Sequence, residues 1–194
     1  SMERQQPSGR RILASSHGDP PVVAFHEHAD HESKLLAANG CDLKLLDLDT
    51  SSGKPTAPLR RFVGHHRPVS ALGWCPGEPG LFCSAGLDGF GFLWDLRQQK
   101  PAQSFLALTG TTNILRWSPV ANHMLASASS GGLVCLWDRR HPLVQLSVLS
   151  SGQAPVLDLA WSAFESNHLF TCGGHRSKAK SSGHVKVWDV NSTA

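Results

Sequence analysis

The stretch GHHRPVSALGWCPGEPGLFCSAGLDGFGFLWD, residues 64–95, decides the fold that the sequence predicts. Apolar residues stand at positions 69, 71, 72 and 74 of Val69–Trp74, close to the alternation of a half-buried β-strand. The cluster at 75–80 is rich in Gly and Pro and predicts a turn. A second segment of small residues then leads to a third segment that ends in Trp94-Asp95. The stretch therefore predicts three short strands joined by turns.

This arrangement recurs along the chain at similar intervals. An Asp follows the third strand at four places, which are 48, 43 and 51 residues apart. The aromatic residue of the first strand recurs at intervals of 49, 43 and 44 residues. The two sets of markers are Asp47, Asp95, Asp138 and Asp189, and Phe25, Trp74, Trp117 and Trp161. This period is that of a propeller blade, so we expect an all-β propeller segment with four blades.

Repeat two resembles the WD-repeat family in Gly64-His65, Ser84, Asp88 and Trp94-Asp95. In that family the His, the second-strand Ser, the turn Asp and the third-strand Trp form a hydrogen-bonded chain that braces a blade. The resemblance implies that His65, Ser84, Asp88 and Trp94 form this structural tetrad. A linked network of this kind is physically sensible, because a buried imidazole and a buried indole N–H each need a partner.

The other repeats depart from this signature. The position of Asp88 is taken by Gly40 in repeat one, Gly131 in repeat three and Ser182 in repeat four, and repeat one also lacks the third-strand Trp. We therefore expect the brace in one blade only. The resemblance divides the chain into an N-terminal tail and four WD repeats, at residues 1–19, 20–63, 64–107, 108–150 and 151–194.

The number of repeats leaves two interpretations of the ring open. The usual ring of the family has about seven blades, within the range typical of propellers. A closed four-bladed ring would need a further strand for repeat four, which the N-terminal residues 10–15, around Ile12 and Leu13, could supply by pairing near Val185. We favour the alternative, in which the four blades are part of a larger ring.

Two narrower resemblances concern function. Residues 88–97 of repeat two (DGFGFLWDLR) and 136–142 of repeat three (LWDRRHP) are similar to the WD-repeat subunits of the SEA/GATOR complexes, which relay amino-acid status to the TOR kinase. The motif Trp-Asp-x-Arg, ending at Arg97 and at Arg140, resembles that of substrate receptors of cullin-RING ubiquitin ligases. There the planar guanidinium docks on the adaptor by paired hydrogen bonds. The alternative is that each Arg merely caps a turn in solvent.

Composition and motifs argue against catalysis. The net charge is +3, the five Cys are scattered, and no nucleophile elbow, HExxH motif or phosphate-binding glycine loop occurs, so we expect no catalytic residues and no cofactor. His26, His28 and His31 form the one ligand-dense stretch, which we interpret as a polar loop and not a metal site. We interpret the basic residues between His175 and Ser182 as a solvated loop insertion.

The partners expected from this reasoning are other proteins of a multisubunit complex, in which the chain is a scaffold. We expect no small-molecule substrate and no membrane insertion, and the slight charge gives no case for nucleic acid. The scattered cysteines fit a reducing compartment, so we expect the protein in the cytoplasm. It could reach the nucleus or a lysosomal or vacuolar surface through its partners.

Overall fold

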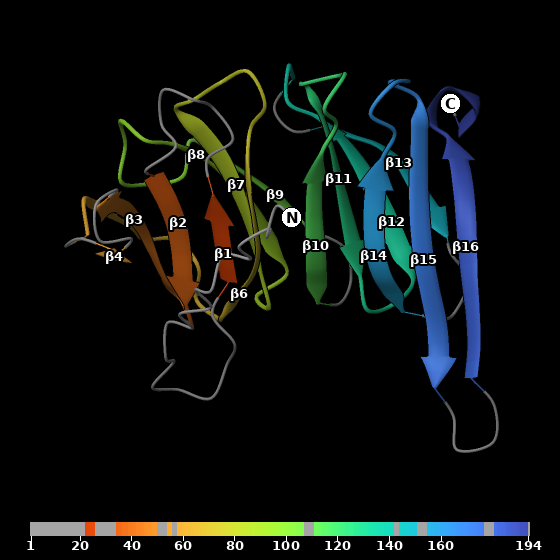
Figure 1. The fold of residues 1–194 in the computed structure, drawn as a ribbon, viewed down its shortest axis with the longest axis horizontal. Helices are drawn as coiled ribbons and strands as arrows, with labels where there is room; N and C mark the ends of the chain where they lie inside the picture. The colour runs from red at the N-terminus through yellow and green to blue at the C-terminus, as the bar shows by residue number, and fades with distance from the viewer. Residues whose placement is uncertain are drawn as a thin grey trace, which may run out of the picture.

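The structure, a computed structural model, describes residues 22–25, 34–49, 54–55, 58–106, 111–141, 144–150, 155–176 and 181–193. These residues form antiparallel strands and a short 3-10 helix, η2 (Val190–Thr193). The prediction of an all-β fold is confirmed (Figure 1). Within the described ranges no helix has the length and apolar character needed to cross a membrane.

The strands form four sheets, which we number as blades in chain order (Figure 1). Blade 1 has β1 (Val22–Phe25), β2 (Lys34–Asn39), β3 (Asp42–Asp49), β4 (Lys54–Pro55) and β5 (Arg60–Phe62). Blade 2 has β6 (Val69–Trp74), β7 (Leu81–Gly86), β8 (Phe90–Asp95) and β9 (Gln103–Leu106). Blade 3 has β10 (Thr112–Trp117), β11 (Met124–Ser129), β12 (Leu133–Asp138) and β13 (Val144–Ser150). Blade 4 has β14 (Val156–Trp161), β15 (His168–Arg176) and β16 (Ser181–Asp189).

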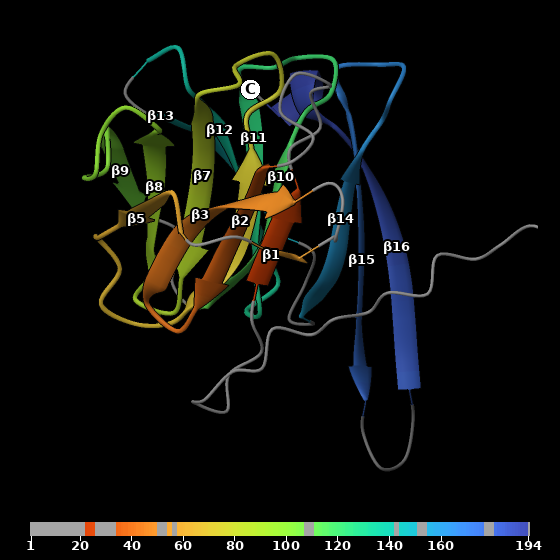
Figure 2. The same ribbon diagram turned by 60° about the vertical axis from the view of Figure 1, so that its left-hand side comes forward.

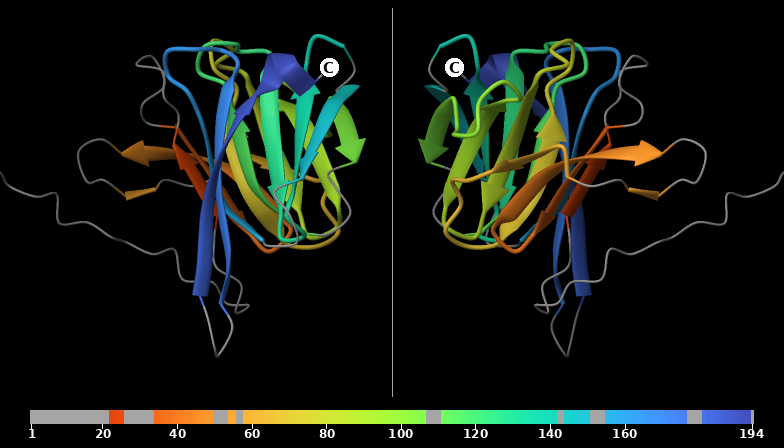
Figure 3. Two further views of the ribbon diagram at one scale, coloured as in Figure 1. Left: turned by 90° about the vertical axis from the view of Figure 1, so that its right-hand side faces the viewer. Right: turned by 90° about the vertical axis from the view of Figure 1, so that its left-hand side faces the viewer.

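Each of blades 2 and 3 is a meander in which successive strands pair in chain order. The turn between the second and third strands uses a glycine with positive φ, Gly89 at 80° in blade 2 and Gly132 at 83° in blade 3. Glycine suits this position because a Cβ would be strained there. Blade 4 has a longer hairpin, which extends past the other strands (Figure 3).

This hairpin corrects one expectation from the sequence. We expected an inserted loop from His175 to Ser182, but the structure pairs His175 with Ser182 and Arg176 with Ser181. The ladder between β15 and β16 continues through these residues because backbone pairing does not require apolar side chains. Residues 177–180 lie outside the described part of the chain.

The blades pack side by side through apolar faces (Figure 2). Small or aliphatic side chains of one blade meet the Trp-bearing face of the next. Between blades 2 and 3, for example, Cys83 and Ala85 pack in one cluster with Trp117 and Trp137. Equivalent clusters join blade 1 to blade 2 and blade 3 to blade 4. The core is therefore distributed between neighbouring blades, as expected of stacked repeats.

An indole hydrogen bond joins each pair of neighbouring blades. Nε1 of Trp74 donates to the carbonyl of Ala24 at 3.2 Å, and Nε1 of Trp117 donates to that of Gly73 at 3.4 Å. Nε1 of Trp161 donates to the carbonyl of Arg116 at 2.9 Å. In each case the acceptor lies on the first strand of the preceding blade. The aromatic markers that defined the repeat thus also tie the blades together.

The described strands form an open row of blades, in which no strand of blade 4 pairs with a strand of blade 1. Both interpretations of the ring, closed with four blades or part of a larger ring, therefore stay open. The proposed closing strand around Ile12 and Leu13 lies outside the described residues, as does the cluster at His26, His28 and His31. The boundaries of the four repeats stay a prediction.

Candidate functional site

The structure brings His65, Ser84, Asp88 and Trp94 together in blade 2. Nε1 of Trp94 donates to Oγ of Ser84 at 2.8 Å, and that Oγ lies 2.7 Å from Nε2 of His65. Nδ1 of His65 is 2.9 Å from Oδ2 of Asp88. Ser84 and Trp94 are fully buried, and His65 is buried. The four side chains form one connected path from the third strand of the blade to the turn between β7 and β8.

The protonation of this path follows from its partners. An ionised carboxylate accepts only, so Nδ1 of His65 carries the proton that bonds to Asp88. Burial lowers the pKa of His65 and outweighs Asp88, which raises it. A neutral ring then leaves Nε2 as the acceptor for the Ser84 hydroxyl, whose oxygen accepts from Trp94. All the hydrogen bonds between the four side chains therefore have a defined donor and acceptor.

Asp88 anchors the end of the path to the backbone. Its Oδ2 accepts from the backbone N–H of His66 at 3.0 Å, and its Oδ1 accepts from that of Phe90 at 3.1 Å. Burial alone would raise the pKa of Asp88, but the hydrogen bonds from His65, Phe90 and His66 outweigh it and lower the pKa. The carboxylate therefore stays ionised and holds two loops in place.

Part of the brace recurs where we expected none. In blade 3, Nε1 of Trp137 donates to Oγ of Ser127 at 2.9 Å. In blade 4, Nε1 of Trp188 donates to Oγ1 of Thr171 at 3.0 Å. The expectation that bracing is confined to blade 2 was wrong for this indole–hydroxyl link. The sequence held a signal for blade 3, because Ser127 precedes Trp137 by ten residues, as Ser84 precedes Trp94.

Arg97 and Arg140 occupy equivalent turns, which follow β8 and β12. In each turn the Arg binds the Asp two residues earlier. Nε of Arg97 lies 2.9 Å from Oδ1 of Asp95, and Nε of Arg140 lies 3.0 Å from Oδ1 of Asp138. The backbone N–H of each Arg donates to the same Oδ1 atom at 2.9 Å. We call these two turns together the arginine rim.

In each turn of the arginine rim, a buried carboxylate holds an exposed guanidinium. The side chains of Asp95 and Asp138 are 8% and 5% exposed, whereas those of Arg97 and Arg140 are 86% and 60% exposed. Hydrogen bonds from the two Arg side chains lower the pKa of both carboxyls. The alternative that each Arg caps a turn therefore accounts for the edge of the guanidinium that binds the Asp. The Nη1 group makes no hydrogen bond within the described chain and is open to a partner.

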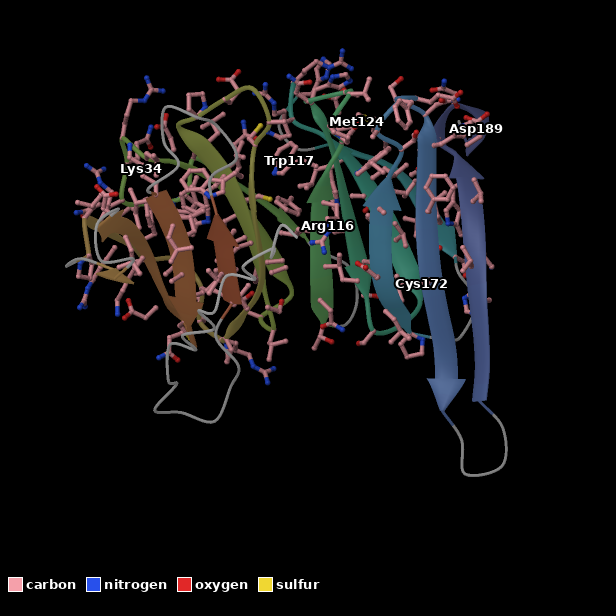
Figure 4. All side chains as sticks on the ribbon, viewed as in Figure 1. Lys34, Arg116, Trp117, Met124, Cys172 and Asp189 are labelled. Atoms are coloured by element: carbon pink, nitrogen blue, oxygen red, sulfur yellow. The ribbon has the colours of Figure 1, made fainter. Side chains whose placement is uncertain are left out.

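Both turns lie at the same edge of their blades. Asp95 pairs with Leu81 and Asp138 with Met124, the first residues of the second strands. Figure 4 places Met124 and Asp189, the equivalent Asp of blade 4, at this same edge. The third strands of blades 2, 3 and 4 therefore end at one edge, and the arginine rim occupies its part in blades 2 and 3.

Further rim residues were missed by the sequence reasoning. Nη2 of Arg139 contacts Oε1 of Glu78 at 3.1 Å, and its Nε donates to the carbonyl of Asn122 at 3.2 Å, so Arg139 ties blade 3 to blade 2. Val120 and Phe164 lie in the loops between the first and second strands of blades 3 and 4 and are 44% and 93% exposed. A bulky side chain in a loop of this kind was the available signal for Phe164.

Three of the described cysteines are buried, and the described residues offer no metal cluster. Burial raises the pKa of Cys75 and of Cys135 to about 11 and raises that of Cys83 further. Such thiols stay protonated and behave as apolar core. No group of three or more His, Cys, Asp or Glu side chains in the described ranges could hold a metal ion.

Consecutive antiparallel blades, joined through apolar faces and braced by indole–hydroxyl bonds, define a β-propeller module that presents loops on a rim. Comparison with known sequences agrees. Residues 56–95 match the family described as WD domain, G-beta repeat. This match covers the end of blade 1 and the first three strands of blade 2.

Several curated proteins are similar to the chain. GATOR2 complex protein WDR59 of Mus musculus is 25% identical over 162 residues, which is 83% of this chain and 16% of that protein. The Homo sapiens protein of the same name is 25% identical over 161 residues, 82% of this chain and 16% of that protein. Protein transport protein SEC31 of Chaetomium globosum is 28% identical over 107 residues, 55% of this chain and 8% of that protein. The chain thus spans less than a fifth of the length of these relatives.

Proposed function

We propose that the chain is a non-catalytic protein-interaction scaffold, a subunit of a multiprotein complex, and that the arginine rim is its docking site. The observation that carries the proposal is the matched geometry of Arg97 and Arg140, each fixed by a buried carboxylate with its outer edge in solvent. A side chain that is already ordered loses little conformational entropy when it binds. The guanidinium fork suits an acidic partner surface, because it matches carboxylates in pairs.

The neighbouring loops add an apolar anchor to this rim. Phe164 projects from blade 4 with most of its surface in water, and Val120 lies in the equivalent loop of blade 3. Protein interfaces commonly combine aromatic anchors with Arg. We therefore expect a partner that presents acidic side chains beside an apolar pocket.

The similarity to WDR59 supports a more specific proposal. Relatives named as a GATOR2 complex protein and as a protein transport protein favour membership of a large assembly. We propose nutrient signalling to the TOR kinase as the process, as the resemblance to SEA/GATOR subunits implies. The protein would then act in the cytoplasm and reach a lysosomal or vacuolar surface, or the nucleus, through its partners.

A second candidate function is that of a substrate receptor of a cullin-RING ubiquitin ligase. The observation that favours it is the repetition of Trp-Asp-x-Arg in consecutive blades, with both Arg side chains exposed on one rim. In this role the arginines would bind the ligase adaptor. The two proposals differ in which protein is lost when the arginines are removed.

Affinity purification of the full chain, followed by quantitative mass spectrometry, tests both proposals. We expect Arg97→Ala with Arg140→Ala to stay folded, because the backbone N–H of residues 97 and 140 still donates to each buried carboxylate, and to lose its main partner. Arg116→Ala is the control, since Arg116 is 51% exposed in its side chain but lies on β10 and not in a turn of the arginine rim (Figure 4). Loss of complex subunits supports the scaffold, and loss of a cullin adaptor supports the receptor. Retention of every partner refutes docking at the rim.

A further inference from the structure

The residue that follows the third-strand Asp has the same backbone role in blades 2, 3 and 4. The N–H groups of Leu96, Arg139 and Val190 each donate to the carbonyl of the residue directly before the second strand, at 2.8, 3.0 and 2.8 Å. The side chains of Leu96 and Val190 are apolar and pack against the clusters that join their blades to the preceding blades. In two of the three blades, this position therefore serves apolar packing between neighbouring blades.

Arg139 departs from this pattern at the junction of blades 2 and 3. Its Nη2 lies 3.1 Å from Oε1 of Glu78, and its Nε donates to the carbonyl of Asn122 at 3.2 Å. Blade 3 has Ala121 at the position that Glu78 occupies in blade 2, because the carbonyl of each accepts from the first N–H of the second strand. Ala121 packs against the same apolar cluster as Val190. Charged side chains thus join blades 2 and 3 where apolar side chains join blades 3 and 4.

This charged junction lies between the two turns of the arginine rim. Arg139 directly precedes Arg140, and Leu96 directly precedes Arg97. The N–H of Leu96 binds a carbonyl of the loop that carries Glu78. Glu78 in turn contacts Arg139. A continuous path of hydrogen bonds and an ion pair therefore leads from one arginine turn to the other.

The ion pair fixes how the loops of the two blades lie against each other. Beside it, Sγ of Cys75 lies 3.8 Å from the carbonyl of Asn122, and a Cβ added at Gly77 would lie 2.7 Å from Nδ2 of Asn122. An ion pair at a partly exposed site contributes little to the free energy of unfolding. Unlike an apolar contact, however, a guanidinium bonds only in the directions of its planar fork. Arg139 thus sets the direction of the contact as well as its distance.

We propose that Arg139 and Glu78 hold the two guanidinium groups of the arginine rim at a fixed separation. Given the proposed function of the rim as a docking site, it then fits a folded partner surface that carries two carboxylates at the matching separation. After one carboxylate of such a surface has bound, the second contact is intramolecular and strengthens binding only when the two separations agree. A flexible acidic segment adapts to any separation, so it gains nothing from a fixed one and loses its own conformational entropy on binding.

A variant that copies the apolar junction separates positioning from packing. Glu78→Ala with Arg139→Val places between blades 2 and 3 the residue types found between blades 3 and 4, and leaves the net charge and both rim arginines unchanged. We expect an unchanged thermal midpoint. In affinity purification of the full chain, capture of the proteins that depend on the rim should fall to the level of Arg97→Ala alone. Arg116→Ala removes an ion pair with Asp158 between blades 3 and 4, and as the control it should keep full capture.

The proteins that depend on the rim are those lost from Arg97→Ala with Arg140→Ala. If this variant loses none, the rim does not dock a partner, and a fixed separation of its arginines has no role in binding. If it loses proteins that Glu78→Ala with Arg139→Val captures in full, the rim is a docking site and the positioning role is refuted.

Electron paramagnetic resonance measures the separation without a partner. Spin-labelled amino acids replace Gln98 and His141, the exposed residues directly after the two rim arginines. We expect a narrow distribution of distances in the parent chain and in Arg116→Ala, and a broader one in Glu78→Ala with Arg139→Val. Equal widths in all three chains would overturn the fixed separation, whatever the purification shows.

A poly-glutamate peptide distinguishes a folded partner surface from a flexible acidic segment. The peptide should bind Glu78→Ala with Arg139→Val no more weakly than it binds the wild-type chain, because a flexible chain adapts to the separation of the arginines. An affinity for the peptide that falls in this variant would show that flexible segments also depend on the fixed separation. That result would overturn the assignment of a folded surface as the partner.

Discussion

Replacing Ser84 with Ala removes the centre of the brace in blade 2 and leaves two buried groups without a partner. The indole N–H of Trp94 loses its acceptor, and Nε2 of His65 loses its donor. Trp94 is fully buried and His65 is 7% exposed, so water reaches neither group easily. Each unsatisfied buried polar group costs about 1–3 kcal/mol, so Ser84→Ala should lower the free energy of unfolding by about 2–6 kcal/mol.

Ser127→Ala is the matched control for this prediction. Ser127 is equally buried and occupies the same position in blade 3, but it accepts one indole bond and no imidazole adjoins it among the described contacts. Its replacement should cost about 1–3 kcal/mol. Urea denaturation followed by Trp fluorescence gives both free energies. If Ser84→Ala costs no more than Ser127→Ala, the four-residue chain does not act as a connected brace.

Three further predictions concern the brace and the close packing around it. Asp88→Ala should cost about 1–3 kcal/mol in the same denaturation experiment, because it removes the partner of buried His65. The pKa of His65 is lowered in the folded chain, so folding favours the neutral ring. The contribution of the neutral ring to the free energy of unfolding is therefore present above pH 6.5 and is lost as the pH falls below that value. His65→Asn should flatten the dependence of the free energy of unfolding on pH between pH 7 and 5. Gly91→Ala should destabilise by about 1–3 kcal/mol, because an added Cβ would lie 2.1 Å from Cζ of Phe105, whereas Gly80→Ala, with no atom within 4 Å, should be nearly neutral.

The blades were predictable because their markers are side chains with fixed structural roles. The third-strand Trp recurs in blades 2, 3 and 4 because its indole packs and bonds within the blade, and the Asp recurs in all four blades at the end of the third strand. The residues of the tetrad could be named because the resemblance to the WD-repeat family implies this role for side chains at these positions. Periodicity thus predicted the fold, and the resemblance predicted the path from Trp94 to Asp88.

The hydrogen bonds and ion pairs between blades could not be predicted from the sequence in this way. An indole bond to a backbone carbonyl can use any residue as acceptor, and here the acceptors are as different as Ala24, Gly73 and Arg116. The ion pair of Arg139 with Glu78 joins side chains 61 residues apart. The hairpin at Arg176 and Ser181 was misjudged because strand pairing there rests on the backbone and not on an apolar pattern.

Hydrogen–deuterium exchange of the full chain, alone and bound to the partner recovered by affinity purification, tests docking at the arginine rim most directly. Bound protein should exchange more slowly in the turns that hold Arg97 and Arg140 and in the loop that holds Phe164. The residues of β10, which include Arg116, should exchange at unchanged rates. Protection that leaves both arginine turns unchanged would contradict the assignment of this rim as the docking site.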